Sequence, residues 1–149
     1  MIIDLGCGSR KKSPDFFGID CQQLDGVNLV HDCNFPIPLP DSCADEIYAY
    51  DFLEHVQNDK RIHIMSEIWR LLKPDGILYS STPSTDGRGA FQDPTHYAFW
   101  NINSFNYFTD DRYRALYSIK PKFSIIALET TPKTLDEICW VIAHLKAVK

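Results

Sequence analysis

The sequence predicts an α/β fold built on a mostly parallel, twisted sheet, and the first two strands carry the prediction. An apolar run at residues 2–5 leads into a turn that contains Gly6 and Gly8, and a second run at residues 17–20 ends on Asp20. About eleven residues separate these runs, which is close to the shortest connection between parallel strands. Further along, an amphipathic helical pattern stands directly before a near-continuous apolar run, as in a parallel sheet.

The first turn and the second strand predict a nucleoside site. Glycine has no Cβ, so the backbone at Gly6 and Gly8 can lie close to a ligand, and a side chain at Gly8 is expected to obstruct it. Asp20 ends the neighbouring strand, where its carboxylate can accept hydrogen bonds from a ribose diol. The third glycine of a dinucleotide-binding turn is missing. Pro14 limits any helix in this connection to one or two turns, so a pyrophosphate cradle is not expected.

The remaining elements follow in order. A helix is expected between Asn58, as its capping residue, and Leu72, with Met65 and Trp69 in the core, and residues 73–76 stop it. Two late apolar runs suit an antiparallel hairpin at the end of the sheet. The other strands are expected at residues 28–32, 44–50, 77–81, 123–128 and 140–146.

Five motifs in this order resemble those of class I S-adenosylmethionine-dependent methyltransferases, in the small type 11 branch. They are Asp-Leu-Gly-Cys-Gly at 4–8, Gly-Ile-Asp at 18–20, Val-His-Asp at 30–32, Phe-Leu-Glu-His-Val at 52–56 and Leu-Leu-Lys-Pro-Asp-Gly at 71–76. The resemblance covers roughly residues 1–83. It departs from the family in two places: the chain opens on its first strand, without the usual preceding segment, and the first helix is short.

The resemblance implies a Rossmann-like methyltransferase fold of seven strands, a bound S-adenosylmethionine and methyl transfer to a nucleophile. Asp32 matches the position that accepts from the adenine amino group in the family. The cofactor-binding residues are expected to be Asp4, Gly6, Cys7, Gly8, Arg10, Asp20, Cys21, Asp32, Cys33 and Asp51.

Composition and charge narrow the class of protein. The net charge is −5 and the pI is about 5.4, without the basic stripe of a nucleic-acid surface. The only basic run, residues 10–12, is either a solvated turn or places Arg10 or Lys11 against the methionine carboxylate. No apolar stretch is long enough for a membrane span, and no signal peptide opens the chain. Five irregularly spaced cysteines indicate reduced thiols in a cytoplasm and no metal site.

The segment between residues 82 and 117 is expected to hold the acceptor, because it is long, irregular and leaves the fifth strand beside the cofactor. Phe91, Trp100 and Phe105 are expected to shape a pocket for a small molecule, although such aromatics also form local cores. His96 is the first choice for a catalytic base and His55 the second. A histidine that only satisfies local hydrogen bonds is the alternative for each.

The chain is expected to form one methyltransferase domain over residues 1–149, and its oligomeric state is not indicated. Two other classes of protein stay open. A module that binds S-adenosylmethionine without catalysis would keep the glycines and Asp20 while tolerating a blocked acceptor pocket. A nucleotide-dependent oxidoreductase is disfavoured by the absent third glycine.

Overall fold

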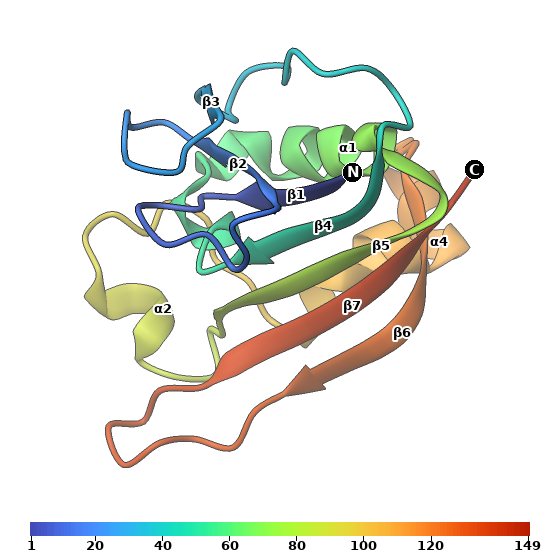
Figure 1. Ribbon diagram of the computed structural model, residues 1–149. Helices are drawn as coiled ribbons and strands as arrows, with labels where there is room; N and C mark the ends of the chain where they lie inside the picture. The colour runs from blue at the N-terminus through green and yellow to red at the C-terminus, as the bar shows by residue number, and fades with distance from the viewer.

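The computed structural model describes residues 1–149 as one seven-stranded sheet in the order β3-β2-β1-β4-β5-β7-β6 (Figure 1). Strands β1 to β5 are parallel, and β7 is antiparallel to both of its neighbours. The predicted parallel sheet with its C-terminal antiparallel hairpin is therefore confirmed. The strands are β1 (Ile2–Leu5), β2 (Phe17–Asp20), β3 (Leu29–Val30), β4 (Ala44–Tyr50), β5 (Leu72–Pro83), β6 (Lys122–Thr130) and β7 (Trp140–Val148).

All of the helices lie in two connections, the one from β4 to β5 and the one from β5 to β6. None of them is long and apolar enough to cross a membrane. The first connection contains the 3-10 helices η1 (Leu53–His55) and η2 (Asn58–Lys60) and the helix α1 (Arg61–Leu71), and the second contains α2 (Gly89–Gln92), η3 (Ile102–Phe105), α3 (Asn106–Thr109) and α4 (Asp111–Leu116).

The hydrophobic core lies between one face of the sheet and the helices α1, η3 and α3. Alternate residues of β4 and β5 enter it, such as Ile47 and Leu78, because successive side chains of a strand point to opposite faces. Ile64, Ile68 and Leu71 of α1 meet them at helical spacing, and all five of these residues are fully buried. The predicted helix thus packs as its apolar pattern requires.

The opposite face of the sheet has no helical layer over β1 to β3, because turns and loops make those connections. Aromatic rings cover it instead. The rings of Tyr48 and Tyr79 stack at 4.8 Å, Phe16 packs on Tyr48 at 5.1 Å, and His144 meets the edge of Tyr79 at 4.9 Å. His144 of β7 is thus part of the aromatic packing on this face.

Two local predictions are wrong. Residues 9–16 form turns rather than a short helix, because the Lys11 ammonium donates to the carbonyls of Pro14 and Phe16 and to Asn28 Oδ1 at 2.9–3.2 Å. These bonds fold the connection around one side chain. Asn58 does not cap α1 either: it opens η2, and the residue before the helix is Lys60, without a side-chain cap.

Candidate cofactor site

A cavity of about 620 Å³ opens at the carboxyl ends of β1, β2 and β4. This is the edge at which open parallel sheets bind their ligands. Three carboxylates line the cavity, and no lysine or arginine does. Its lining residues are Gly6, Ile19, Asp20, Cys21, Gln22, His31, Asp32, Cys33, Asn34, Asp51, Phe52, His55, Val56, Thr95 and Tyr97.

Asp20 is fixed in place at the end of β2. Its Oδ2 accepts the backbone N–H of Gly8 at 2.9 Å, and its Oδ1 accepts the backbone N–H of Gln22 at 2.9 Å. Each carboxylate oxygen has two lone pairs, so one on each remains free for a ligand. Asp20 therefore presents a pre-oriented acceptor pair to the cavity.

The two glycines of the first turn have different surroundings. Both have a positive φ, +65° at Gly6 and +54° at Gly8, which favours glycine. A Cβ on Gly6 would lie 2.7 Å from Cδ2 of Phe52, another lining residue, whereas a Cβ on Gly8 would meet nothing within 4 Å. Gly6 lines the cavity and Gly8 does not, and Gly8 donates its N–H to Asp20.

Asp4 supports the turn from behind. Its carboxylate is 2% exposed and accepts the backbone N–H of Lys12 at 2.8 Å, so it ties the β1–β2 connection to the sheet. Burial raises the pKa of Asp4, against the opposing effect of the Lys12 N–H and charge. Asp4 and Cys7 do not line the cavity.

The loop after β3 contributes the other end of the cavity. Asp32 Oδ1 accepts from the backbone and side-chain nitrogens of Asn34, at 2.9 and 2.8 Å, and Asn34 Oδ1 in turn accepts the N–H of Gln57. Cys33 is buried beside Asp32, and burial, reinforced by that negative charge, raises the pKa of its thiol to about 12. Cys33 is therefore a neutral, apolar part of the wall.

An ion pair on α1 holds this loop in place. Arg70 donates to both carboxylate oxygens of Glu67 and to the carbonyls of Ile37 and Leu39, at 2.8–2.9 Å. Glu67 also accepts the backbone N–H of Ile37 at 2.7 Å. The prolines of this segment prevent regular structure, so the clamp supplies the order that a helix or strand would otherwise give.

Two acidic residues, Asp51 and Glu54, follow the end of β4. Asp51 lines the cavity with φ of +48°, an uncommon conformation for a residue with a side chain. Glu54 is 2% exposed, and its Oε2 accepts the hydroxyl of Thr82 at 2.6 Å. Burial raises the pKa of Glu54, although the Thr82 hydroxyl opposes this effect.

The two histidines proposed as bases lie together. The rings of His55 and His96 are 5.0 Å apart and meet edge to face. His55 lines the cavity, and its Nδ1 lies 3.1 Å from the carbonyl of Thr95. His96 is largely buried behind it, with Nδ1 3.2 Å from the carbonyl of Ala90. A carbonyl only accepts, so each Nδ1 carries the proton and each Nε2 has the lone pair.

The other predicted residues lie elsewhere. Arg10 is exposed and does not line the cavity, and the Lys11 ammonium is occupied by its three oxygen partners. Phe91 is exposed and stacks on Phe99 at 5.2 Å, outside the lining. These positions leave the cavity without a lysine or arginine side chain.

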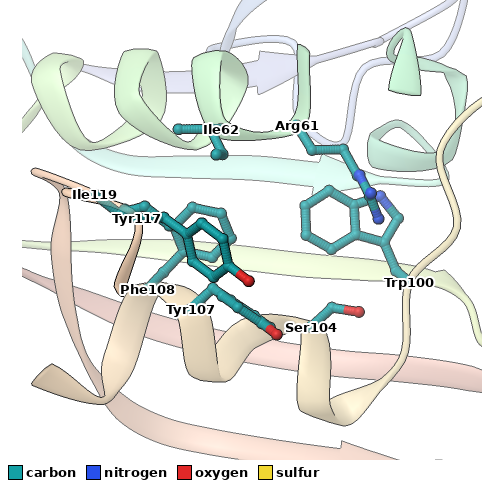
Figure 2. Close-up of a pocket in the computed structure, with 8 residues that line it drawn as sticks. All are labelled: Arg61, Ile62, Trp100, Ser104, Tyr107, Phe108, Tyr117 and Ile119. Carbon is teal, nitrogen blue, oxygen red and sulfur yellow. The ribbon is translucent and has the colours of Figure 1, made fainter. Parts of the chain in front are cut away.

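Trp100 and Phe105 belong to the core. They are at most 1% exposed, their rings are 5.3 Å apart, and Trp100 Nε1 donates to the carbonyl of Leu53. Trp100 also forms one wall of a second cavity of about 410 Å³, which shares no lining residue with the first (Figure 2). In Figure 2, Arg61 and Ile62 of α1 lie on one side of this cavity, and the residues of η3 and α3 lie opposite. The structure does not join the three predicted aromatics into one pocket.

Sequence reasoning missed several lining residues. Phe52, Asn34 and Gln22 each stand next to a residue that was expected, so their position just beyond a strand end was the available signal. Thr95 and Tyr97 come from the segment after β5 and stand on either side of His96, which was expected. Tyr97 is placed by its N–H, which donates to the carbonyl of Glu54.

Comparison with known proteins agrees with this geometry. Residues 19–80 match the family described as methyltransferase domain. No curated protein matches the chain.

Among solved structures, the chain is similar to 1,6-didemethyltoxoflavin-N1-methyltransferase of Burkholderia thailandensis with bound S-adenosylhomocysteine, at 13% identity, covering 99% of this chain and 71% of that one with a TM-score of 0.68. It is also similar to an S-adenosylmethionine-dependent methyltransferase of Methanosarcina mazei, at 18% identity, 99% and 92% coverage and a TM-score of 0.67. The YcgJ protein of Bacillus subtilis gives 12% identity, 99% and 92% coverage and a TM-score of 0.68.

At these identities the solved structures establish the fold. The family match adds the methyltransferase domain, and the order of the strands and the position of the cavity agree with it. The methyltransferase domain match over residues 19–80 and the shared fold together support a class I S-adenosylmethionine-dependent methyltransferase.

Proposed function

We propose that the protein transfers a methyl group from S-adenosylmethionine to a small-molecule acceptor, with the cofactor in the cavity at the ends of β1, β2 and β4. One observation carries the proposal: Asp20 and Asp32 line this cavity together with the close backbone approach at Gly6. Asp20 would accept from the ribose hydroxyls, and Asp32 from the adenine amino group. The methionine part would then lie against Gly6 and Asp51.

The charge of the cavity supports this cofactor over a dinucleotide. S-adenosylmethionine carries a cationic sulfonium and an ammonium group, which suit a wall with Asp20, Asp32 and Asp51 and no cationic side chain. The pyrophosphate of NAD would meet the same acids, and no helix begins in residues 9–16 to point its N-terminus at it. The cavity therefore favours the cationic cofactor.

His55 is the group best placed to serve the acceptor, because it lines the cavity and its Nε2 has the free lone pair. The bound cofactor supplies a methyl group that is already activated, so the protein must align the nucleophile and remove its proton. In this proposal His55 takes that proton as the acceptor's electron pair forms the new bond to carbon. His96 packs on His55 and acts as a positioning residue rather than as the base.

The experiment is a calorimetric titration of the full chain with S-adenosylmethionine, S-adenosylhomocysteine and NAD, followed by an acceptor screen with labelled S-adenosylmethionine. We expect saturable binding of the first two ligands, none of NAD, and transfer of label to a small molecule. Binding of NAD alone would refute the proposal. Binding of both adenosyl ligands without transfer to any acceptor would instead indicate a binding module.

A further inference from the structure

Glu54, His55 and His96 form a cluster of one carboxylate and two imidazoles. A single catalytic base would not require all three groups. One ligand atom from each, a carboxylate oxygen or a ring nitrogen, lies within 4.8 Å of the others. The three residues come from two parts of the chain: Glu54 and His55 are adjacent in η1, and His96 lies in the loop after α2. The fold therefore brings three metal-ligating groups to one point at the wall of the cavity.

The two imidazoles have the environment of metal ligands. A metal-bound histidine usually donates its other ring N–H to a carbonyl or carboxylate, which fixes the ring and directs its lone pair. Here both Nδ1 atoms lie 3.1–3.2 Å from backbone carbonyls, those of Thr95 and Ala90. Neither Nε2 atom makes a hydrogen bond, and that of His96 lies 3.8 Å from Asp93 Oδ2.

The carboxylate of Glu54 lacks a cationic partner. It is 2% exposed, and none of the ion pairs in the protein includes it. Its one side-chain partner is the hydroxyl of Thr82. Buried carboxylates are usually paired with a charge or bound to a metal, so a cation beside Glu54 would supply the missing partner.

We infer that Glu54, His55 and His96 bind a first-row divalent cation such as Mn²⁺, Co²⁺ or Zn²⁺. Two nitrogens and one carboxylate oxygen suit these ions better than Mg²⁺ or Ca²⁺, which prefer oxygen ligands. Ligand atoms about 2.0–2.2 Å from a metal are at most about 4.4 Å apart, so a small side-chain adjustment closes the site.

Metal binding itself does not depend on the proposed function, but its consequence for the methyl acceptor rests on that proposal. His55 lines the cavity, so coordination positions not filled by the protein face the acceptor. An acceptor hydroxyl bound there would lose its proton to solvent more easily, because a cation stabilises the oxygen anion. Its electron pair would then form the bond to the methyl carbon as the carbon–sulfur bond breaks, with that pair remaining on sulfur. When the cation is bound, His55 is therefore a ligand in place of the base, His96 is a second ligand, and the acceptor atom is expected to be an oxygen.

The test is a calorimetric titration of the full chain with Mn²⁺ in the absence of any adenosyl ligand. We expect one site per chain, and His55→Ala and His96→Ala should each weaken it by at least about tenfold. His144→Ala, which removes a histidine from β7, is the matched control and should bind as the wild type does. Because His55 is exposed, its variant tests the site even where His96→Ala fails to fold.

Absorption of the Co²⁺ form identifies the ligands. Nitrogen and oxygen ligands should give ligand-field bands alone, whereas a thiolate charge-transfer band would place the ion on Cys21 or Cys33 and overturn the inference. Absence of saturable Mn²⁺ binding, or unchanged affinity in both histidine variants, would also overturn it. S-adenosylhomocysteine is titrated separately into the same samples, so failure of the cofactor proposal is distinguishable from failure of the metal site.

Discussion

Asp20 is the residue on which cofactor binding depends most. Its carboxylate receives the N–H groups of Gly8 and Gln22 and keeps one lone pair on each oxygen for the ribose. A hydrogen bond to a charged group contributes about 1.5–3 kcal/mol, so Asp20→Ala should weaken binding of S-adenosylhomocysteine about ten- to a hundredfold in calorimetry. Asp25→Ala removes the same charge from an exposed turn and should leave the affinity unchanged. Equal affinity in Asp20→Ala would remove this residue from the site.

The two glycines of the first turn should differ in their response to an alanine. At Gly6 the added Cβ would push the Phe52 ring from a contact of 2.7 Å, and that ring lines the cavity. Gly6→Ala should therefore cost stability and nearly all affinity for S-adenosylhomocysteine. Gly8→Ala shares the positive φ, which costs about 1–2 kcal/mol, but meets open space and should retain most of the binding. Loss of binding in Gly8→Ala with normal binding in Gly6→Ala would mean that the ligand lies on the other side of the turn.

At the scale of elements, the clamp between α1 and the loop after β3 should dominate local stability. Arg70→Ala removes the partner of the largely buried Glu67 and three further hydrogen bonds, two to loop carbonyls and one to the Asp41 side chain. We expect a loss of about 2–3 kcal/mol in urea unfolding. Arg112→Ala breaks an exposed pair with Asp110 and should change the stability much less, because solvent screens an exposed ion pair. Equal costs in the two variants would show that the clamp does not order the loop.

The same clamp predicts a pH dependence. Burial alone would raise the pKa of Glu67, but the hydrogen bonds from Arg70 and the Ile37 N–H outweigh it and lower this pKa below the ordinary value of 4.5. A lowered folded-state pKa gives stability that is present above 4.5 and is lost as the pH falls through the folded-state value. The free energy of unfolding of the wild type, measured with urea, should therefore fall on acidification. The fall should be smaller in Arg70→Ala. Parallel curves for the two proteins would contradict this assignment.

The elements show what local sequence could and could not predict. Asp20 ends β2, as its apolar run predicted, and β4 has the predicted bounds, whereas β3 is only Leu29–Val30 and Asp32 lies in the loop after it. The turns of residues 9–16 depend on Lys11 reaching Asn28, a contact that no local pattern records. The Arg70 clamp joins segments about thirty residues apart in the same way.

The acceptor side was the hardest to predict, for a physical reason. Aromatic rings suit a core as well as a pocket. Trp100 was expected to shape the acceptor pocket, but it is buried in the core and its Nε1 donates to the carbonyl of Leu53. Two residues of this segment do reach the cavity. Thr95 is held by its N–H and hydroxyl, which donate to Asp93 Oδ1, and Tyr97 by its N–H, which donates to the carbonyl of Glu54. The bond from Tyr97 joins segments that are distant in the sequence, so no local pattern records it.

In the molecule as a whole, one face of the sheet and the carboxyl edge of its parallel strands have different surroundings. One face is covered by helices and forms the core, while the carboxyl edge of the parallel strands collects acidic side chains into one cavity. The second cavity, beside Arg61 and Tyr117, lies apart from these acids (Figure 2). The central claim is that the acidic cavity is where the cofactor binds.

A crystal structure of the full chain with S-adenosylhomocysteine tests this claim most directly. We predict the ribose hydroxyls within hydrogen-bond distance of Asp20, the adenine beside Asp32, and the thioether sulfur facing His55. Two results would contradict the account: a ligand bound in the cavity between Arg61 and Tyr117, or a ligand whose ribose lies away from Asp20.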